Sequence, residues 1–189
     1  MSELSVGSLS GLAANSYVID VASGSQLTQP GMVLAVESVL KTDIFSASVT
    51  AGDSVAVTDL SITYEVADSA NKLLITAFVG VMSASGNQGD VGIAVHDGTS
   101  FIGIGDAAGS RTQITAGGRP SDSGSTLLGI SPSLTFLHTP GAGSKTYTLR
   151  AINISNGTQT LYANRTERND DAAFVRRGAS ALTIQEVAG

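Results

Sequence analysis

The two histidines, His96 and His138, are the side chains of this sequence best suited to acid–base catalysis or to binding a metal ion. Either role would need a second imidazole or a carboxylate brought close by the fold. Each histidine instead ends a segment that alternates like a strand, which favours a place at a sheet edge or at the rim of a core. No serine has histidine and aspartate partners in an arrangement that the sequence indicates. We therefore expect no catalytic residues and no enzymatic activity.

Three aspartates, Asp90, Asp97 and Asp106, could converge on a calcium ion, since calcium binds carboxylate and carbonyl oxygens. The alternating aspartate spacing of a calcium-binding loop is absent, however. Residues 103–109 read GIGDAAG and partly match a dinucleotide-binding loop, but no helix pattern follows them. A tight loop explains these glycines better, because it would let two backbones approach closely, those of neighbouring subunits included. The prediction is no bound metal and no cofactor.

Arginines and acidic residues alternate in one stretch late in the chain: Arg165, Arg168, Asp170, Asp171, Arg176 and Arg177. Two interpretations stay open: an ion network that faces another subunit or a ligand, and a solvated loop whose exposed pairs are worth under about 1 kcal/mol each. Asn-x-Ser/Thr sequences begin at Asn153, Asn156 and Asn164. We expect them to be chance matches, because the N-terminus shows no secretory signal.

Composition excludes several kinds of chemistry. The chain has 189 residues, no cysteine and a net charge of −6, and charged residues make up 14% of it, against roughly 25% in an average soluble domain. Disulfides and thiolate sites are therefore excluded, and a polyanion such as a nucleic acid would be repelled. The longest apolar run, residues 73–82, has about half the length that a membrane-spanning helix needs. We expect synthesis in a host cytoplasm and no membrane insertion.

Strands dominate the pattern along the chain. Leu60, Ile62, Tyr64 and Val66 alternate with polar residues, as in a strand with one buried face. Residues 72–82 are nearly all apolar, which predicts a central strand covered on both faces. Further strands are expected at residues 32–39, 45–49, 91–96, 101–104, 134–138, 146–154, 160–165 and 181–187. No convincing helix is found, so the predicted fold is an all-β jelly-roll β-sandwich.

Two turns indicate hairpins in this pattern. Asp97-Gly98 would join strands 91–96 and 100–104, and Asn156-Gly157 would join strands 146–154 and 160–165. The apolar alternation of strand 146–154 shifts by one position after Ala151, which predicts a β-bulge near that residue.

The chain divides into two unequal parts. Residues 1–30 are rich in serine, glycine and alanine and end at Gln29-Pro30-Gly31, where proline and glycine indicate a break. This part is too short to hold a core of its own, so we expect an extended N-terminal arm that binds another protein. Residues 31–189 form the predicted head domain.

Six motifs give the sequence a family resemblance. They lie at residues 30–36 (PGMVLAV), 41–46 (KTDIFS), 71–75 (NKLLI), 103–111 (GIGDAAGSR), 162–165 (YANR) and 186–189 (EVAG). Residues 30–189 thereby resemble a β-sandwich domain common in tailed-phage virion proteins, and residues 21–25 resemble the leaders of short phage fibre-like proteins. The resemblance implies a jelly roll that trimerises through one sheet edge, similar to tumour-necrosis-factor and complement-head domains.

The expected function is therefore structural. The first hypothesis is a homotrimeric capsid decoration protein or short head fibre on the virion surface, anchored to a phage capsid or tail protein through residues 1–30. The alternative is a tail fibre or receptor-binding tip that recognises a host-surface glycan or protein through loops such as residues 106–125. A third hypothesis, a sugar-active enzyme, would need two carboxylates that meet across a cleft.

Overall fold

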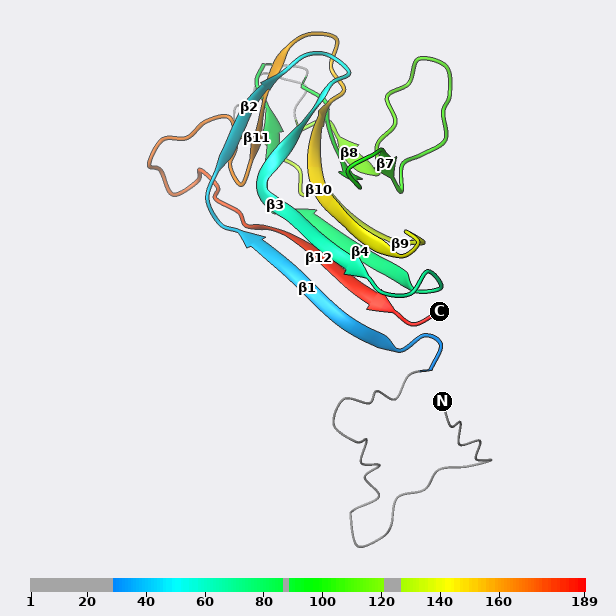
Figure 1. Cartoon of the computed structure of the whole chain (residues 1–189). Coiled ribbons are helices and arrows are strands. Elements are labelled where there is room, and N and C mark those ends of the chain that lie inside the picture. The colour runs from blue at the N-terminus through cyan, green and yellow to red at the C-terminus, as the bar shows by residue number, and fades with distance from the viewer. Residues whose placement is uncertain (1–28, 87–88, 121–126) are drawn as a thin grey trace, which may run out of the picture.

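A computed structural model describes residues 29–86, 89–120 and 127–189 (Figure 1). Throughout these ranges the regular secondary structure consists of β-strands, which confirms the predicted all-β fold. The predicted arm lies outside the described residues except for Gln29 and Pro30, which enter a turn closed by a 3.0 Å hydrogen bond from Met32 N to Gln29 O. No part of the described chain forms a helix long and apolar enough to cross a membrane.

Two antiparallel sheets form the body of the molecule. The four-stranded sheet has the order β1 (Val33–Lys41), β12 (Ser180–Val187), β4 (Lys72–Val79) and β9 (Ser133–His138). The second sheet has the order β3 (Ser54–Val66), β10 (Gly143–Asn153), β6 (Val91–His96) and β7 (Phe101–Ile102), and β8 (Ala116–Gly118) also pairs with β6.

These eight ordered strands follow the jelly-roll winding. When only these eight strands are counted along the chain, the four-stranded sheet holds the first, eighth, third and sixth, and the second sheet holds the second, seventh, fourth and fifth. The first strand therefore pairs with the last, the second with the next to last, and so on inward, as in a long hairpin wrapped around a core. The predicted jelly-roll β-sandwich is confirmed.

A third, smaller sheet continues the four-stranded one. Its order is β2 (Phe45–Val49), β11 (Gln159–Ala163) and β5 (Met82–Ala84). This order repeats that of β1, β12 and β4, because each strand of the small sheet is the neighbour in sequence of one strand of the large sheet. The two sheets thus form one surface with a bend in it, and β2 and β11 rise from the far end of β1 and β12 (Figure 1).

The core lies between the two large sheets. Leu60, Ile62, Tyr64 and Val66 of β3 are buried, as the alternation predicts. In β4 the buried side chains also alternate with exposed ones, and Phe78 is largely open to solvent. The prediction that this strand is covered on both faces is therefore wrong within a single chain, because none of the described residues covers the outer face of its sheet.

One of the two predicted hairpins is confirmed. β6 and β7 pair across the Asp97-Gly98 turn, where Asp97 N donates to Ser100 O at 3.0 Å. The hairpin predicted at Asn156-Gly157 is wrong, because β10 and β11 lie in different sheets. Both edges of β10 already pair, with β3 and with β6, so β11 has to find its partners elsewhere.

The β-bulge predicted near Ala151 lies on the neighbouring strand. The β10–β6 ladder runs without a shift, whereas the β10–β3 ladder shifts between Thr148 and Arg150. The extra residues are on β3, where Asp59 adopts a left-handed conformation with φ of 64°. The alternation of β10 changes because Ile152, on its outer face, is also buried.

Candidate functional site

The two histidines occupy separate environments at strand ends. His96 Nδ1 accepts a 3.1 Å hydrogen bond from Gly98 N, and its ring packs edge-on against Phe101 at 5.3 Å between centroids. His138 packs edge-on against the Tyr147 ring at 6.0 Å. In the part of the chain that the structure describes, neither histidine has a carboxylate as a hydrogen-bond partner. Within the described ranges, no three histidine, aspartate or glutamate side chains converge as metal ligands would.

Of the three aspartates considered as calcium ligands, two hold cations of the chain itself. Asp90 forms two hydrogen bonds with Arg119, at 2.8 and 3.0 Å. Asp97 accepts from Lys145 Nζ at 2.9 Å and from the turn amides of Thr99 and Ser100. Burial alone would raise the pKa of Asp97, but these donors hold it far below its usual range. Both carboxylates therefore act as structural partners, and Asp106 lies apart on an exposed loop.

His138 gives stability a pH dependence above the range in which carboxylates titrate. Burial and the nearby charge of Lys145 lower the pKa of His138, against the opposite effect of Asp97. The unfolded chain therefore binds a proton near the ordinary pKa of about 6.5, while the folded chain still excludes it. Between pH 7.5 and pH 5 we expect the midpoint of thermal unfolding to fall, and His138→Gln to flatten that slope. A midpoint that stays constant over this range in the natural chain would contradict the prediction.

The same environment affects the neighbouring tyrosine. Burial, followed by the charge of Asp97, raises the pKa of Tyr147 to about 12, and its buried hydroxyl has no hydrogen-bond partner among the described residues. The depressed pKa of Asp97 contributes stability that is lost only below about pH 4, so it does not overlap the histidine range.

The glycine-rich loop follows β7 and projects from the body of the molecule (Figure 1). Gly103 has a left-handed φ of 63°, and a Cβ built there would lie 2.6 Å from the ring of Phe136. The prediction was a close approach of two backbones, whereas Gly103 approaches a side chain of the same chain. Around Gly109 there is open space, so only part of the motif has this packing role.

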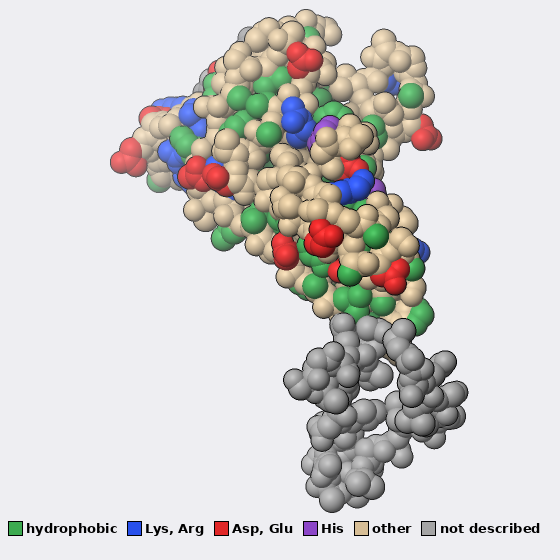
Figure 2. All heavy atoms as spheres, viewed as in Figure 1, with side chains coloured by type: hydrophobic (Ala, Val, Ile, Leu, Met, Phe, Trp, Pro, Cys, Tyr) green, Lys and Arg blue, Asp and Glu red, His purple; other side chains and the backbone are tan. Residues whose placement is uncertain are grey.

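The arginine-rich loop contains local pairs. Arg165 stacks over Tyr162 at 4.5 Å and donates to the carbonyl oxygens of Thr166 and Glu167. Arg168 binds Asp170, and both side chains are exposed. Figure 2 shows basic and acidic side chains gathered at this end of the molecule. These contacts fit the solvated-loop interpretation, since exposed pairs contribute under about 1 kcal/mol each.

Two of the three glycosylation-like sequences are inaccessible. The side chains of Asn153 and Asn164 are fully buried. Asn153 Nδ2 donates to Val49 O and Gly157 O, both at 2.8 Å, and Asn164 Nδ2 donates to Lys41 O and Asp43 O, both at 2.9 Å. These asparagines are therefore structural, which agrees with the interpretation of their motifs as chance matches.

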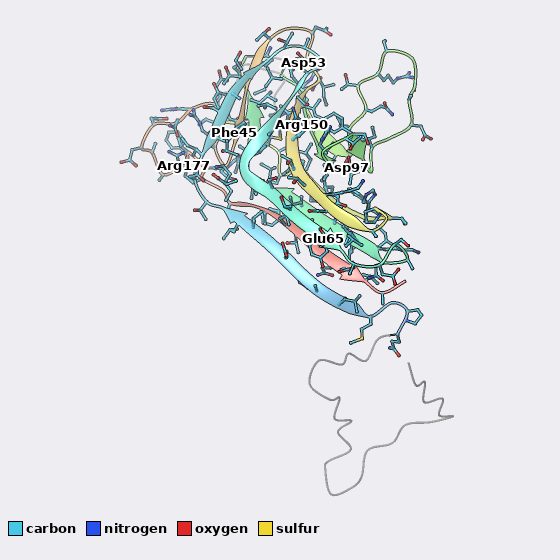
Figure 3. All side chains as sticks on the ribbon, viewed as in Figure 1. Phe45, Asp53, Glu65, Asp97, Arg150 and Arg177 are labelled. Carbon is cyan, nitrogen blue, oxygen red and sulfur yellow. The ribbon has the colours of Figure 1, made fainter. Side chains whose placement is uncertain are left out.

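A hollow of about 400 Å³ lies between the β2–β3 turn and the chain that follows β7. The apolar side chains that line it are Phe101, Ile104 and Ile152. The polar ones include Asp53, Thr112 and Gln113. One wall is fixed by Arg150, which donates to Ser54 Oγ at 2.9 Å and to Ser54 O at 3.0 Å. Figure 3 shows Asp53 at the turn and Arg150 below it on β10.

A lining that combines apolar side chains with amide, hydroxyl and carboxylate groups suits a small polar ligand that also has an apolar face, such as a sugar. Asp53 is the one carboxylate among the described residues that line the hollow, whereas glycoside hydrolysis uses a pair of carboxylates. Sequence reasoning singled out only the loop of residues 106–125, of which the structure describes 106–120. Asp53 and Phe101 come from distant parts of the chain, and no spacing signal links them.

Comparisons with known proteins gave structural likenesses only. No protein-family model matches the chain, and no curated protein matches it. Among solved structures, it is similar to infectious bursal disease virus, Gx strain, at 10% identity and a TM-score of 0.43, over 90% of this chain and 46% of that one. It is also similar to the cyanophage Pam1 capsid asymmetric unit, at 11% identity and a TM-score of 0.34, over 90% of this chain and 98% of that one. The chain spans just under half the length of the bursal disease virus chain that it matches.

Proposed function

We propose that this protein is a non-enzymatic structural component of a bacteriophage virion. In this proposal it is displayed on the virion surface as a homotrimer, and its role is that of a capsid decoration protein or short head fibre. Residues 1–30 form the anchoring arm and residues 31–189 the head.

The observation that carries the proposal is that motifs of the phage resemblance meet one another in the fold. Asn71, which opens the motif at residues 71–75, donates to Glu186 Oε1 at 2.8 Å, and Gly189 N donates to Asn71 Oδ1 at 3.2 Å. Tyr64 donates to the other oxygen of the Glu186 carboxylate at 2.8 Å. Burial and this carboxylate raise the pKa of Tyr64 above its ordinary value. Two motifs that lie far apart in the sequence thus meet at one buried site, which supports a resemblance that extends to the fold.

Copy number per virion tests the decoration role. Quantitative mass spectrometry of purified particles is expected to find hundreds of copies, since a decoration protein repeats over the whole shell. A count that corresponds to a few trimers would instead place the protein on a tail.

Deletion of residues 1–30 is expected to abolish binding to capsids while the head still folds. A truncated protein that binds capsids as well as the full chain would overturn the arm assignment.

The hollow beside Asp53 favours a second candidate function, recognition of a host-surface saccharide by a tail fibre tip. Its mixture of apolar and polar side chains is what such a ligand needs, and the loop of residues 106–120 provides Thr112 and Gln113 of its lining.

For that function, Asp53→Asn is expected to weaken binding of host-surface glycan by about tenfold, because a hydrogen bond to a charged group is worth about 1.5–3 kcal/mol. Asp53 is exposed, so the substitution leaves the fold intact. Binding to purified host-cell glycans is the measurement, and Asp171→Asn, an exposed aspartate outside the hollow, is the control. Equal binding by both variants and the natural chain would exclude this hollow as the glycan site.

A further inference from the structure

The outer face of the four-stranded sheet carries a broad apolar surface. We call it the outer sheet face. It consists of the side chains opposite to the buried ones on each strand: Val36, Ser38 and Leu40 of β1, Ala181, Thr183 and Gln185 of β12, Leu74, Thr76 and Phe78 of β4, and Ser133, Thr135 and Leu137 of β9.

Large apolar side chains on this face are well exposed. The exposed fractions are 66% for Leu40, 55% for Val36, 54% for Leu137 and 42% for Phe78. Strand register places them in two rows that cross the sheet. One row runs through Leu40, Ala181 and Phe78 and ends at Ser133, and the other runs through Val36, Leu74 and Leu137 with Gln185 between the first two. Scattered exposed apolar residues are normal on a protein surface, but two mostly apolar rows on one sheet face indicate a contact surface.

Hydroxyl groups form a third row between the two apolar rows. Ser38 and Thr183 are 2.8 Å apart between their hydroxyl oxygens, and those of Thr76 and Thr135 are 3.3 Å apart. Each hydroxyl therefore has a partner in its own row. These four hydroxyl groups can be covered by another protein surface without a large desolvation penalty.

Charge decides which partner fits. Among the described residues of these four strands, Lys72 is the one charged side chain on the outer sheet face, and it lies at the end of the face. The whole chain, in contrast, carries a net charge of −6. Copies of an acidic protein repel each other wherever carboxylates meet, so an uncharged face is where identical copies can pack. A nucleic acid would need a basic surface instead.

The area of the face is sufficient for such a contact. Four strands of about eight residues, with a rise of about 3.4 Å and a spacing of about 4.8 Å, cover about 500 Å². Two surfaces of this size bury about 1,000 Å² together, which is the area that a biological interface is expected to reach.

We propose that the outer sheet face packs against another copy of this chain and forms the subunit contact of the homotrimer. The inference rests on the proposed function for the trimer, and it assigns the contact to the face of a sheet that includes the edge strand β1.

The test is the oligomeric state of the full chain, measured by size-exclusion chromatography with light scattering. The natural chain is expected to be a trimer at micromolar concentration. Leu40→Glu is expected to shift it to monomer, with at least a tenfold rise in the concentration needed for association. Because Leu40 is mostly exposed, the variant should retain its strand circular dichroism. Phe174→Glu, a matched control on an exposed loop residue, should remain a trimer.

The outcomes separate the two proposals. A Leu40→Glu variant that is still a trimer would overturn the outer sheet face as the contact and leave the trimer standing. A natural dimer that Leu40→Glu dissociates would keep the face and overturn the trimer. A monomeric natural chain would overturn both. If Leu40→Glu fails to fold, Leu137→Lys on β9, at the opposite edge, provides the same comparison.

Discussion

Replacement of Asn164 with alanine is expected to lower the free energy of unfolding by about 4 kcal/mol. The Asn164 side chain is fully buried at the bend between the four-stranded and three-stranded sheets. Its amide nitrogen donates to Lys41 O and Asp43 O, and its oxygen accepts from Ser180 Oγ at 2.6 Å. Alanine would leave these groups buried without partners and would also have to adopt the left-handed φ of 62°.

Chemical denaturation monitored by circular dichroism measures this loss. Asn164→Gly separates the two causes, because glycine tolerates the left-handed backbone but makes none of the side-chain bonds. We expect its loss to lie about 1 kcal/mol below that of alanine. Asn169→Ala, in the exposed loop, is the matched control and should change stability by less than about 0.5 kcal/mol. A loss of under about 1 kcal/mol for Asn164→Ala would contradict the structural role assigned to this residue.

Gly80→Val is expected to have an effect of similar or larger size, at least about 4 kcal/mol, and to reduce the yield of folded protein. Gly80 joins β4 to β5 at the same bend. A Cβ built there would lie 2.3 Å from Ala179 O and 2.8 Å from Ala179 N. Both atoms belong to a backbone held in place where the chain enters β12, so neither can move aside as a flexible side chain would.

Expression yield and thermal unfolding measure the effect of Gly80→Val. Gly157→Val is the control, since a Cβ at that turn position meets nothing within 4 Å. Equal stability of the two variants would show that the two backbone segments separate at little cost, contrary to the prediction.

The strands of this fold could be predicted because their faces alternate. Leu60 to Val66 show the pattern in the sequence and are buried as it requires. The turn at Asp97-Gly98 was also predictable, because its two strands are neighbours in the same sheet. The residues at Asn156-Gly157 suit a hairpin turn equally well, but β3 and β6 pair with both edges of β10 and leave no edge for β11. The local sequence contains no information about which strands pair with β10.

The bend at Asn164 could not be predicted for a related reason. Its partners Lys41 and Asp43 lie 123 and 121 residues away in sequence, and only the jelly-roll winding brings them to Asn164 and Ser180. The hollow beside Asp53 and the two apolar rows of the outer sheet face depend likewise on strand register. The individual residues were visible in the sequence, but their positions relative to one another were not.

The pairing of β1 with β12 has a consequence for synthesis of the protein. These strands pair along their whole length, from Val33 with Val187 to Lys41 with Ser180. β12 lies between β1 and β4 and pairs with both. The four-stranded sheet therefore cannot close until residues 180–187 have left the ribosome. Until then, the nascent chain keeps β1 without a strand partner, and its late, long-range closure makes folding slow. Assembly of this sheet therefore waits for β12, and a nascent chain stalled before Ser180 remains open to aggregation through its unpaired strands.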